Sequence, residues 1–290
     1  MSGLALGIVL ASAFLHAGWN YLLKQSERKA VFTWWFLLAS VVLYFPLFVY
    51  SFTPAAIPPA GWVCIAATGL LHGLYFGGIG GAYQRGDLSL VYPLARGSGP
   101  LFVPVLAILL LDEEISPLGM TGIALIVAGI YCIHLRAFSR AALLAPFAAL
   151  KGGASLWAFW TGLAIAGYSL VDKVGVGLVP PPVYIYLMFL IAWLILTPWV
   201  LIREGPWLAG EWRRAPGTIV LVGFLCILTY LMILFALTLE KVSYVAAVRE
   251  ISIVLSAIFG VAWLGESHGR QKLLGAVLVA LGVVAIGLSR

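Results

Sequence analysis

The chain has 290 residues, of which 63% are hydrophobic and only 10% are charged. Because about 25% of the residues in soluble domains are charged, this composition excludes an ordinary soluble fold and indicates a chain that is solvated by lipid. The formal net charge of +6 is spread over short segments between apolar runs, which excludes a nucleic-acid-binding patch and is typical of the basic residues that orient membrane helices.

A helix that spans a bilayer needs about 20 mostly apolar residues. Ten stretches of the sequence meet this requirement, and most of the segments between them are short. No ten-residue segment alternates between apolar and polar residues as the strands of a membrane barrel do. We therefore predict an all-α integral membrane protein with ten transmembrane helices, at residues 4–24, 31–50, 61–83, 88–111, 117–135, 155–173, 183–202, 217–239, 242–264 and 271–288.

The first span carries polar side chains on one face. His16, Trp19, Asn20 and Lys24 follow each other at helical spacing, so they lie on one side of the helix. Since such a stripe is unfavourable against lipid, we expect His16, Trp19 and Asn20 to contact a substrate. His16 is also a candidate proton carrier because its unperturbed pKa is about 6.5, with an ordinary interhelical hydrogen bond as the alternative.

The third span combines a glycine face with an aromatic face. Glycine recurs at every fourth residue from Gly69 to Gly81, which predicts close packing against another helix. His72, Tyr75 and Phe76 lie about 100° around the same helix, where we expect them to line a substrate cavity. Interfacial belts and core packing are the alternative places for aromatic side chains. The aromatic candidates for the cavity wall are Trp19, Tyr75, Tyr92, Tyr168 and Tyr244.

The fourth span contains the segment "YPLARGSGPLFVP" at residues 92–104. Pro93, Gly97, Gly99 and Pro100 weaken a helix, and in membranes such breaks are tolerated where the freed carbonyls face a cavity or a neighbouring helix. We therefore expect a kink next to Arg96 and a helix that moves as a gate, with a simple packing kink as the alternative.

Ionisable residues inside spans are candidates for substrate or ion handling, because each costs a few kcal/mol to insert. Arg96 and Arg249 each lie about eight residues into their spans, so each is expected about 12 Å deep, from opposite faces. Glu250 points about 100° away from Arg249 and is expected to meet another helix. An arginine here can hold a substrate carboxylate bidentately; the alternative is a buried ion pair or capping arginine that locks the two halves together.

The sequence repeats itself after 153 residues. The first repeat is expected at residues 1–136, a linker at 137–154 and the second repeat at 155–290, with five spans in each repeat. An odd number of spans forces the second copy to enter the membrane upside down. Glu113 and Glu266, at helix ends, are expected to be structural caps or salt-bridge partners and not site residues. The matched pairs are Asp87 and Glu240, Arg96 and Arg249, Glu113 and Glu266, Gly122 and Gly275, and Gly129 and Gly282.

Loop charges support the inverted arrangement and predict an orientation. Twelve lysines and arginines lie in the loops after odd-numbered spans, including the central linker, against three in the other loops and the termini. Because basic loops stay in the cytoplasm, this bias places both termini outside it, in a multi-pass protein of the plasma (inner) membrane.

Two segments, "LDEEISPLGMTGIALIVAGI" (111–130) and "LGESHGRQKLLGAVLVALGV" (264–283), resemble the junctions between helices 4 and 5 and between helices 9 and 10 in the drug/metabolite transporter (DMT) superfamily. Together with the ten spans and the repeat, the chain resembles the EamA-type branch over its whole length. The resemblance implies export or exchange of amino acids, other metabolites or drugs through a cavity between two five-helix bundles. Members of the family are usually drawn with cytoplasmic termini, the opposite of what the loop charges predict.

The main functional hypothesis is a secondary transporter, an exporter or exchanger of a small polar metabolite that is amino-acid-like or carboxylate-bearing. One alternative is a transporter of an organic cation, choline-like or a drug, held by an aromatic cage with Glu250; another is a non-transporting membrane scaffold. The four histidines form no HxxxH or HExxH spacing, so we expect no enzyme, cofactor or metal site. A GxxxxGK loop is absent, so we expect no ATP. The expected partners are the bilayer and the solute, for a monomer or homodimer.

Overall fold

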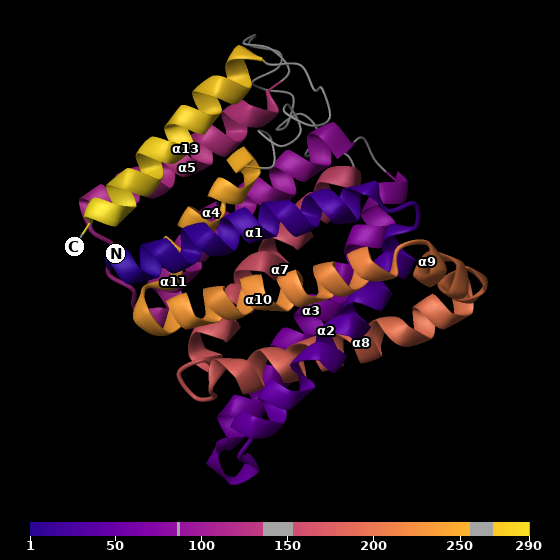
Figure 1. The fold of residues 1–290 in the computed structure, drawn as a ribbon. Coiled ribbons are helices and arrows are strands. Elements are labelled where there is room, and N and C mark those ends of the chain that lie inside the picture. The colour runs from indigo at the N-terminus through magenta and orange to yellow at the C-terminus, as the bar shows by residue number, and fades with distance from the viewer. Residues whose placement is uncertain (86–87, 136–152, 256–268, 290) are drawn as a thin grey trace. The chain divides into compact units, whose positions relative to one another are not determined.

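We describe the fold from a computed structural model that covers residues 1–85, 88–135, 153–255 and 269–289, with side chains except at 77–85, 88–98, 134 and 153–161. The described residues form helices joined by short connections (Figure 1). Two 3₁₀ turns accompany them, η1 (Pro54–Ala56) and η2 (Gly205–Trp207). The α-helices are α1 (Gly3–Gln25), α2 (Lys29–Ser51), α3 (Pro59–Arg85), α4 (Leu88–Leu111), α5 (Pro117–His134), α7 (Gly153–Gly175), α8 (Pro181–Glu204), α9 (Leu208–Arg214), α10 (Pro216–Leu239), α11 (Val242–Arg249) and α13 (Arg270–Leu288).

Each of the ten predicted spans overlaps one of these helices, which confirms the all-helical membrane fold. Six helical segments of the described chain are long and apolar enough to cross a bilayer, and two shorter apolar helices cover Gly99–Leu111 and Pro117–Ile133. Several helices begin with proline, which has the backbone angle of a helix and lacks the N–H that a first turn leaves unpaired. At α5, Ser116 also caps the helix by accepting a hydrogen bond from the Gly119 N–H at 3.1 Å.

The predicted helix at 242–264 is interrupted, whereas the predicted kinked helix at 88–111 is continuous. α11 ends at Arg249, Glu250 lies in a turn, and residues 251–255 are helical again. The Glu250 N–H donates to the Ala247 carbonyl at 3.1 Å, three residues back, which is the tighter pattern of a 3₁₀ turn. α4 keeps its helical assignment from Leu88 to Leu111, through all of its prolines. The kink expected next to Arg96 stays a prediction, and the interruption after Arg249 was not predicted.

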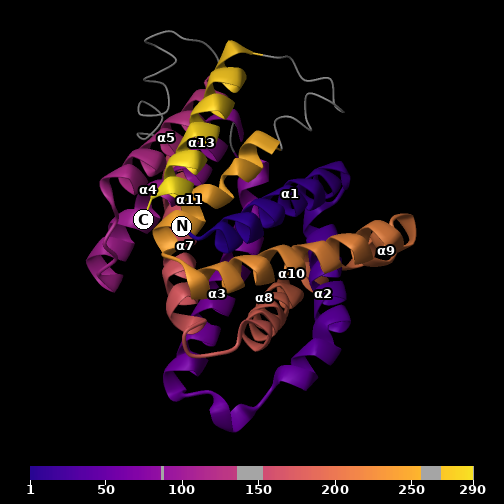
Figure 2. The same cartoon turned by 60° about the vertical axis from the view of Figure 1, so that its left-hand side comes forward.

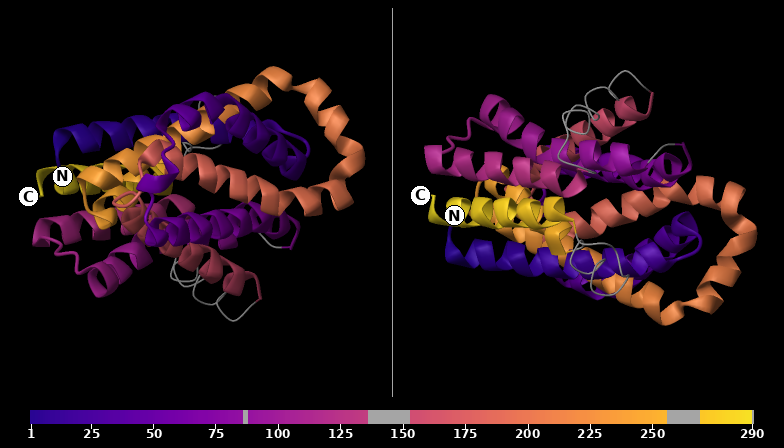
Figure 3. Two further views of the ribbon diagram at one scale, coloured as in Figure 1. Left: turned by 90° about the horizontal axis from the view of Figure 1, so that it is seen from below. Right: turned by 90° about the horizontal axis from the view of Figure 1, so that it is seen from above.

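Helices from equivalent positions of the two repeats pack against each other. α5 and α13 lie side by side in an antiparallel pair (Figure 1, Figure 2). Gly122 faces Gly282, and Gly129 faces Gly275, so closely that a Cβ atom on Gly122 would lie 2.7 Å from the Gly282 carbonyl oxygen. Gly275 is the sequence equivalent of Gly122, and Gly282 that of Gly129, so a two-fold relation between the antiparallel helices exchanges the two contacts. Figure 3 shows the same pair from below and from above.

Two further pairs of equivalent helices, α2 with α8 and α4 with α11, also pack against each other. Contacts divide the chain into two compact units, and each unit draws helices from both halves of the sequence. The predicted repeat boundaries at 136 and 155 therefore describe the sequence and not the compact units, and they stay a prediction. Unit 1 contains residues 1–14, 82–170 and 239–290; unit 2 contains residues 15–81 and 171–238.

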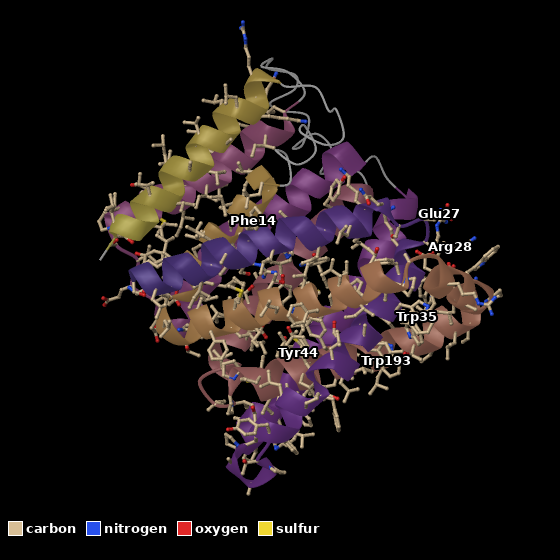
Figure 4. The ribbon with its side chains drawn as sticks, viewed as in Figure 1. Phe14, Glu27, Arg28, Trp35, Tyr44 and Trp193 are labelled. Carbon is tan, nitrogen blue, oxygen red and sulfur yellow. The ribbon has the colours of Figure 1, made fainter. Side chains whose placement is uncertain are left out.

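Within unit 2, the loop after α1 is bound to the corner between α8 and α9. Arg28 donates to Glu204 at 3.1 Å, and its guanidinium lies 3.7 Å from the centre of the Trp207 ring. Glu27 forms an ion pair with Arg214. Figure 4 labels Glu27 and Arg28 at this corner. The loops after the first and seventh predicted spans, α1 and α8, meet here. Two odd-numbered loops therefore lie at the same end of unit 2, as the alternating topology requires. The hydrogen bond from Arg214 holds the pKa of the exposed Glu27 carboxyl below its usual value.

Candidate functional site

The most deeply buried acidic side chain with described neighbours is Asp172, near the end of α7. It is fully buried, and its carboxylate accepts hydrogen bonds from three hydroxyl groups. Thr68 of α3 donates to Oδ1 at 2.6 Å, Tyr184 of α8 donates to the same oxygen at 2.9 Å, and Tyr230 of α10 donates to Oδ2. One carboxylate therefore joins four helices of unit 2.

His72 extends this cluster by one turn along α3. Its Nδ1 atom lies 3.1 Å from the Thr68 hydroxyl and 2.9 Å from the Thr68 carbonyl oxygen. Its ring packs edge-on against the Tyr230 ring, with 5.2 Å between the ring centres. His72 thus touches both a hydroxyl and a ring that themselves bind Asp172, and the five side chains of Thr68, His72, Asp172, Tyr184 and Tyr230 are called the Asp172 cluster below.

Small residues allow the helices of the Asp172 cluster to approach. A Cβ atom on Gly69 would lie 2.7 Å from Ile191 of α8, and one on Gly73 would lie 3.1 Å from Ile195. The predicted glycine face of α3 is therefore confirmed at these two positions as a contact with α8. Gly175 has the same function at the end of α7, where a side chain would lie 2.6 Å from the Tyr184 hydroxyl oxygen and displace it from Asp172.

A series of ring contacts runs from the Asp172 cluster to the polar face of α1. His72 and Phe76 of α3 lie 6.4 Å apart between ring centres, and Phe76 lies 6.3 Å from Phe36 of α2. Phe36 packs on Trp19 at 6.0 Å, and Trp19 meets the edge of His16 at 4.8 Å. The aromatic face predicted for α3 therefore exists, and it packs against rings from other helices of unit 2.

The predicted residues of α1 are placed as follows. His16 and Trp19 are both buried, and the Asn20 amide donates to the His16 carbonyl oxygen at 2.8 Å within the same helix. The indole N–H of Trp19 is buried and has no hydrogen-bond acceptor among the described residues, which is costly unless a ligand or water accepts it. Among these three residues, Trp19 has the strongest claim to a binding role.

Arg249 and Glu250 occupy the interruption after α11. Arg249 is the last residue of the helix and is partly buried, and the Glu250 side chain is 6% exposed. α11 packs against α4, the helix that carries Arg96. The helices of the two predicted arginines are therefore neighbours in unit 1.

Tyr244 has the contacts of a packing residue. Its hydroxyl accepts from the Ser116 N–H at 3.2 Å, at the start of α5, and its ring covers Gly119. Next to it, Glu113 accepts hydrogen bonds from the N–H groups of Val242 and Ser243 at 2.7 and 3.2 Å. The predicted capping role of Glu113 is confirmed: it caps the first turn of α11.

The remaining predicted site residues are distributed over both units. Tyr75 packs on Phe76 at 5.6 Å between ring centres, and Tyr168 is buried in α7. In α4, Gly99 and Pro100 are buried, and a Cβ atom on Gly99 would lie 3.1 Å from Ile165. A gating function for α4 stays a prediction. Four of the predicted site residues lie in the part of α4 whose side chains the structure does not describe: Tyr92, Pro93, Arg96 and Gly97.

The sequence contained a signal for Asp172 that the predictions did not use. Asp172 is an acidic residue at the end of an apolar run, next to Lys173, and the pair resembles a polar helix end at the membrane surface. In the structure Lys173 donates to the Leu237 carbonyl oxygen at 2.7 Å, in the last turn of α10, while Asp172 points to the three hydroxyl groups. Two adjacent charged residues thus have different functions.

Comparison with known proteins supplies a family for this arrangement. Residues 2–135 and 152–288 each match the profile of the EamA-like transporter family. A protein of known crystal structure shares the fold, with a TM-score of 0.75 over 99% of this chain and 98% of that chain at 15% sequence identity. No curated protein sequence matches this chain.

Proposed function

Because the chain belongs to the EamA-like transporter family of the DMT superfamily, it is a membrane transporter, and we propose that it carries a small polar metabolite by alternating access. The substrate class is amino-acid-like or carboxylate-bearing, and the protein acts as an exporter or exchanger in the inner membrane. Family members are transporters, which is consistent with a protein that is not an enzyme and favours transport over a scaffold.

The observation that carries this proposal is the interruption after α11. A partly buried arginine and a buried glutamate follow each other there, in a described segment that is otherwise uncharged. Transporters bind their substrates where spanning helices are interrupted, because the turn frees backbone groups and opens space beside the charged side chains. Arg249 supplies a planar fork that fits a carboxylate, and Glu250 supplies an acceptor for an ammonium group. An amino acid carries both of these groups.

The test is solute counterflow in proteoliposomes, in which unlabelled internal solute drives the entry of labelled solute without any ion gradient. The panel contains amino acids, small carboxylates and choline-like cations. A hydrogen bond to a charged group contributes about 1.5–3 kcal/mol, so Arg249→Ala should weaken the apparent affinity for the carboxylate by roughly 10- to 150-fold. The apparent affinity of Arg249→Lys should lie between those of the wild type and Arg249→Ala, because lysine keeps the charge and loses the bidentate geometry.

The matched control is Arg270→Ala, at the exposed first residue of α13. It removes the same side chain from a position outside the proposed site and should leave counterflow unchanged. Equal transport by Arg249→Ala and by the wild type would remove Arg249 from the site.

An organic cation is the second candidate. One observation favours it: aromatic rings from α1, α2, α3 and α10 form a continuous series that leads to the buried carboxylate of Asp172. Rings and a carboxylate together suit a quaternary ammonium group. Counterflow of choline with no counterflow of amino acids would establish this candidate in place of the first.

A further inference from the structure

We propose that His72 and Asp172, joined through the Thr68 hydroxyl, form a proton-binding site that couples transport to a proton gradient. The inference rests on the proposed function, since only a transporter has a flux to couple. In this proposal His72 takes up the proton and Asp172 supplies the opposite charge.

The first step of the argument is the charge of Asp172. Three hydroxyl groups satisfy the carboxylate with hydrogen bonds, but hydroxyl groups are neutral. Within the described ranges, no basic side chain forms an ion pair with Asp172. An isolated charge in a protein interior is unfavourable by several kcal/mol. The Asp172 cluster therefore gains free energy when one positive charge arrives beside the carboxylate.

The second step identifies the atom that takes the proton. A carbonyl oxygen can only accept a hydrogen bond, so the 2.9 Å contact between His72 Nδ1 and the Thr68 carbonyl places a hydrogen on Nδ1 of the neutral ring. The second proton then binds to Nε2, the other ring nitrogen, and makes the ring positive. The positive ring is linked to the carboxylate by the Thr68 hydroxyl, which accepts from the ring at 3.1 Å and donates to Asp172 at 2.6 Å.

The third step compares His72 with its neighbours. Tyrosine and cysteine side chains have unperturbed pKa values of about 10 and 8.5, and lysine of about 10.4, so they keep one charge state across the physiological range. Histidine changes its charge between about pH 5 and pH 8. The titratable or charged side chains of the described residues on the elements around the pair include another histidine, His16 on α1. The others are Tyr21 and Lys24 on α1, Cys64 and Tyr75 on α3, Tyr168 and Lys173 on α7, Tyr184, Tyr186, Arg203 and Glu204 on α8, and Cys226 and Tyr230 on α10.

The fourth step connects the proton to movement. The hydroxyl groups that bind Asp172 come from α3, α8 and α10, and Asp172 itself lies on α7. Protonation of His72 places a positive charge across the Thr68 hydroxyl from the carboxylate, and this changes the strength of the hydrogen bonds in the Asp172 cluster. The binding of one proton therefore changes the contacts among four helices of unit 2.

The fifth step is an asymmetry between the repeats. When "WNYLLK" is aligned with "YSLVDK", so that Lys24 matches Lys173, Leu23 matches Asp172. The acid is present in one repeat only. A carboxylate that merely joined helices would be equally useful in both halves, whereas a single coupling site needs only one.

The experiment measures transport in two modes with the same proteoliposomes. Counterflow reports substrate exchange without any gradient, and accumulation driven by an imposed pH difference reports coupling. We expect Asp172→Asn and His72→Gln to lose pH-driven accumulation by tenfold or more, and to lose it by a larger factor than they lose counterflow. Asp172→Glu should restore part of the accumulation because it keeps the charge. His134→Gln, at the end of α5, is the control histidine.

The outcomes separate the two proposals. Counterflow without pH-driven accumulation in the wild type would overturn the proton site and leave the proposed function intact, as would accumulation driven by a sodium gradient alone. Absence of counterflow for every solute would overturn the proposed function.

A second measurement does not depend on a substrate. In histidine-labelled protein in detergent, NMR titration follows each imidazole, and His72→Gln identifies the resonance. We expect Asp172→Asn to weaken proton binding by His72 about tenfold, a shift of one pH unit; identical titrations would overturn the proposal. Thr68→Val, which removes only the linking hydroxyl, serves if Asp172→Asn does not fold.

Discussion

The glycine contacts between α5 and α13 make a stability prediction that can be worked out from the structure. A Cβ atom on Gly122 would lie 2.7 Å from the Gly282 carbonyl oxygen and 2.7 Å from Cγ1 of Ile286. Ordinary C···O contacts between helices are about 3.3–3.6 Å, so Gly122→Ala must push the helices apart by roughly half an ångström. Overpacking of this kind destabilises by about 1–3 kcal/mol.

The control is Gly7→Ala in α1, where nothing lies within 4 Å of the new methyl group. There, alanine should stabilise the helix by up to about 1 kcal/mol, because glycine is the poorer helix former. Since 1 kcal/mol corresponds to roughly 2–4 °C in a chain of this size, Gly122→Ala should melt several degrees below Gly7→Ala. The assay is thermal unfolding of the purified proteins in detergent, followed by tryptophan fluorescence.

The double variant tests whether the contact itself is responsible. Gly282→Ala alone should cost about as much as Gly122→Ala, because its Cβ would lie 2.6 Å from the Gly122 carbonyl oxygen. Once one methyl group has separated the helices, the second causes less overlap. The double variant should therefore lose less stability than the two single variants lose in sum. Equal melting temperatures for Gly122→Ala and Gly7→Ala would refute the reasoning.

Three further predictions concern the helix cap, the loop junction and the orientation. Glu113→Ala removes the acceptor of two N–H groups at the start of α11 and should lower stability by about 1–2 kcal/mol in the same assay, more than Glu113→Gln, which keeps one oxygen. The pKa of Glu27 is lowered by Arg214, so the contribution of Glu27 is complete above the ordinary carboxyl pKa and is lost as pH falls through the lowered one. Glu27→Gln should therefore be less stable than the wild type at neutral pH and low salt, and the difference should disappear in acid; a constant difference would exclude the ion pair as its cause. A C-terminal reporter that is active only in the cytoplasm should be inactive, and an active fusion would reverse the predicted orientation.

The helices could be predicted from the sequence because the bilayer sets their length and composition. Each predicted span overlaps a described helix; the ends are within about two residues in α1 and α2 and are identical in α4. The interruption at Glu250 could not be predicted in this way. Sequence rules associate broken helices with proline and glycine, and residues 245–255 contain neither. The break lies at a buried acid, and burial is a property that local sequence rules do not include.

The candidate site was predicted in part, for a similar reason. Helical spacing placed His72 and Phe76 on one face, and the structure confirms that their rings lie together. Helical spacing alone could not show that Phe36 and Tyr230 join them from other helices. Asp172 was missed because its neighbour Lys173 made both residues look like a helix end at the membrane surface. Partners across helices require the tertiary fold.

The crossing of α5 and α13 has a consequence for how the two halves can differ. In a symmetric dimer of identical subunits, an isologous interface uses one surface twice, so every substitution is made twice. Here the two copies of that surface belong to a single polypeptide, and each position can change alone. Gly122 and its equivalent Gly275 are small in both repeats, whereas the matched residues Leu23 and Asp172 are an apolar side chain and an acid. Fusion of the two copies thus permits one buried negative charge where a dimer of identical halves would have to bury two.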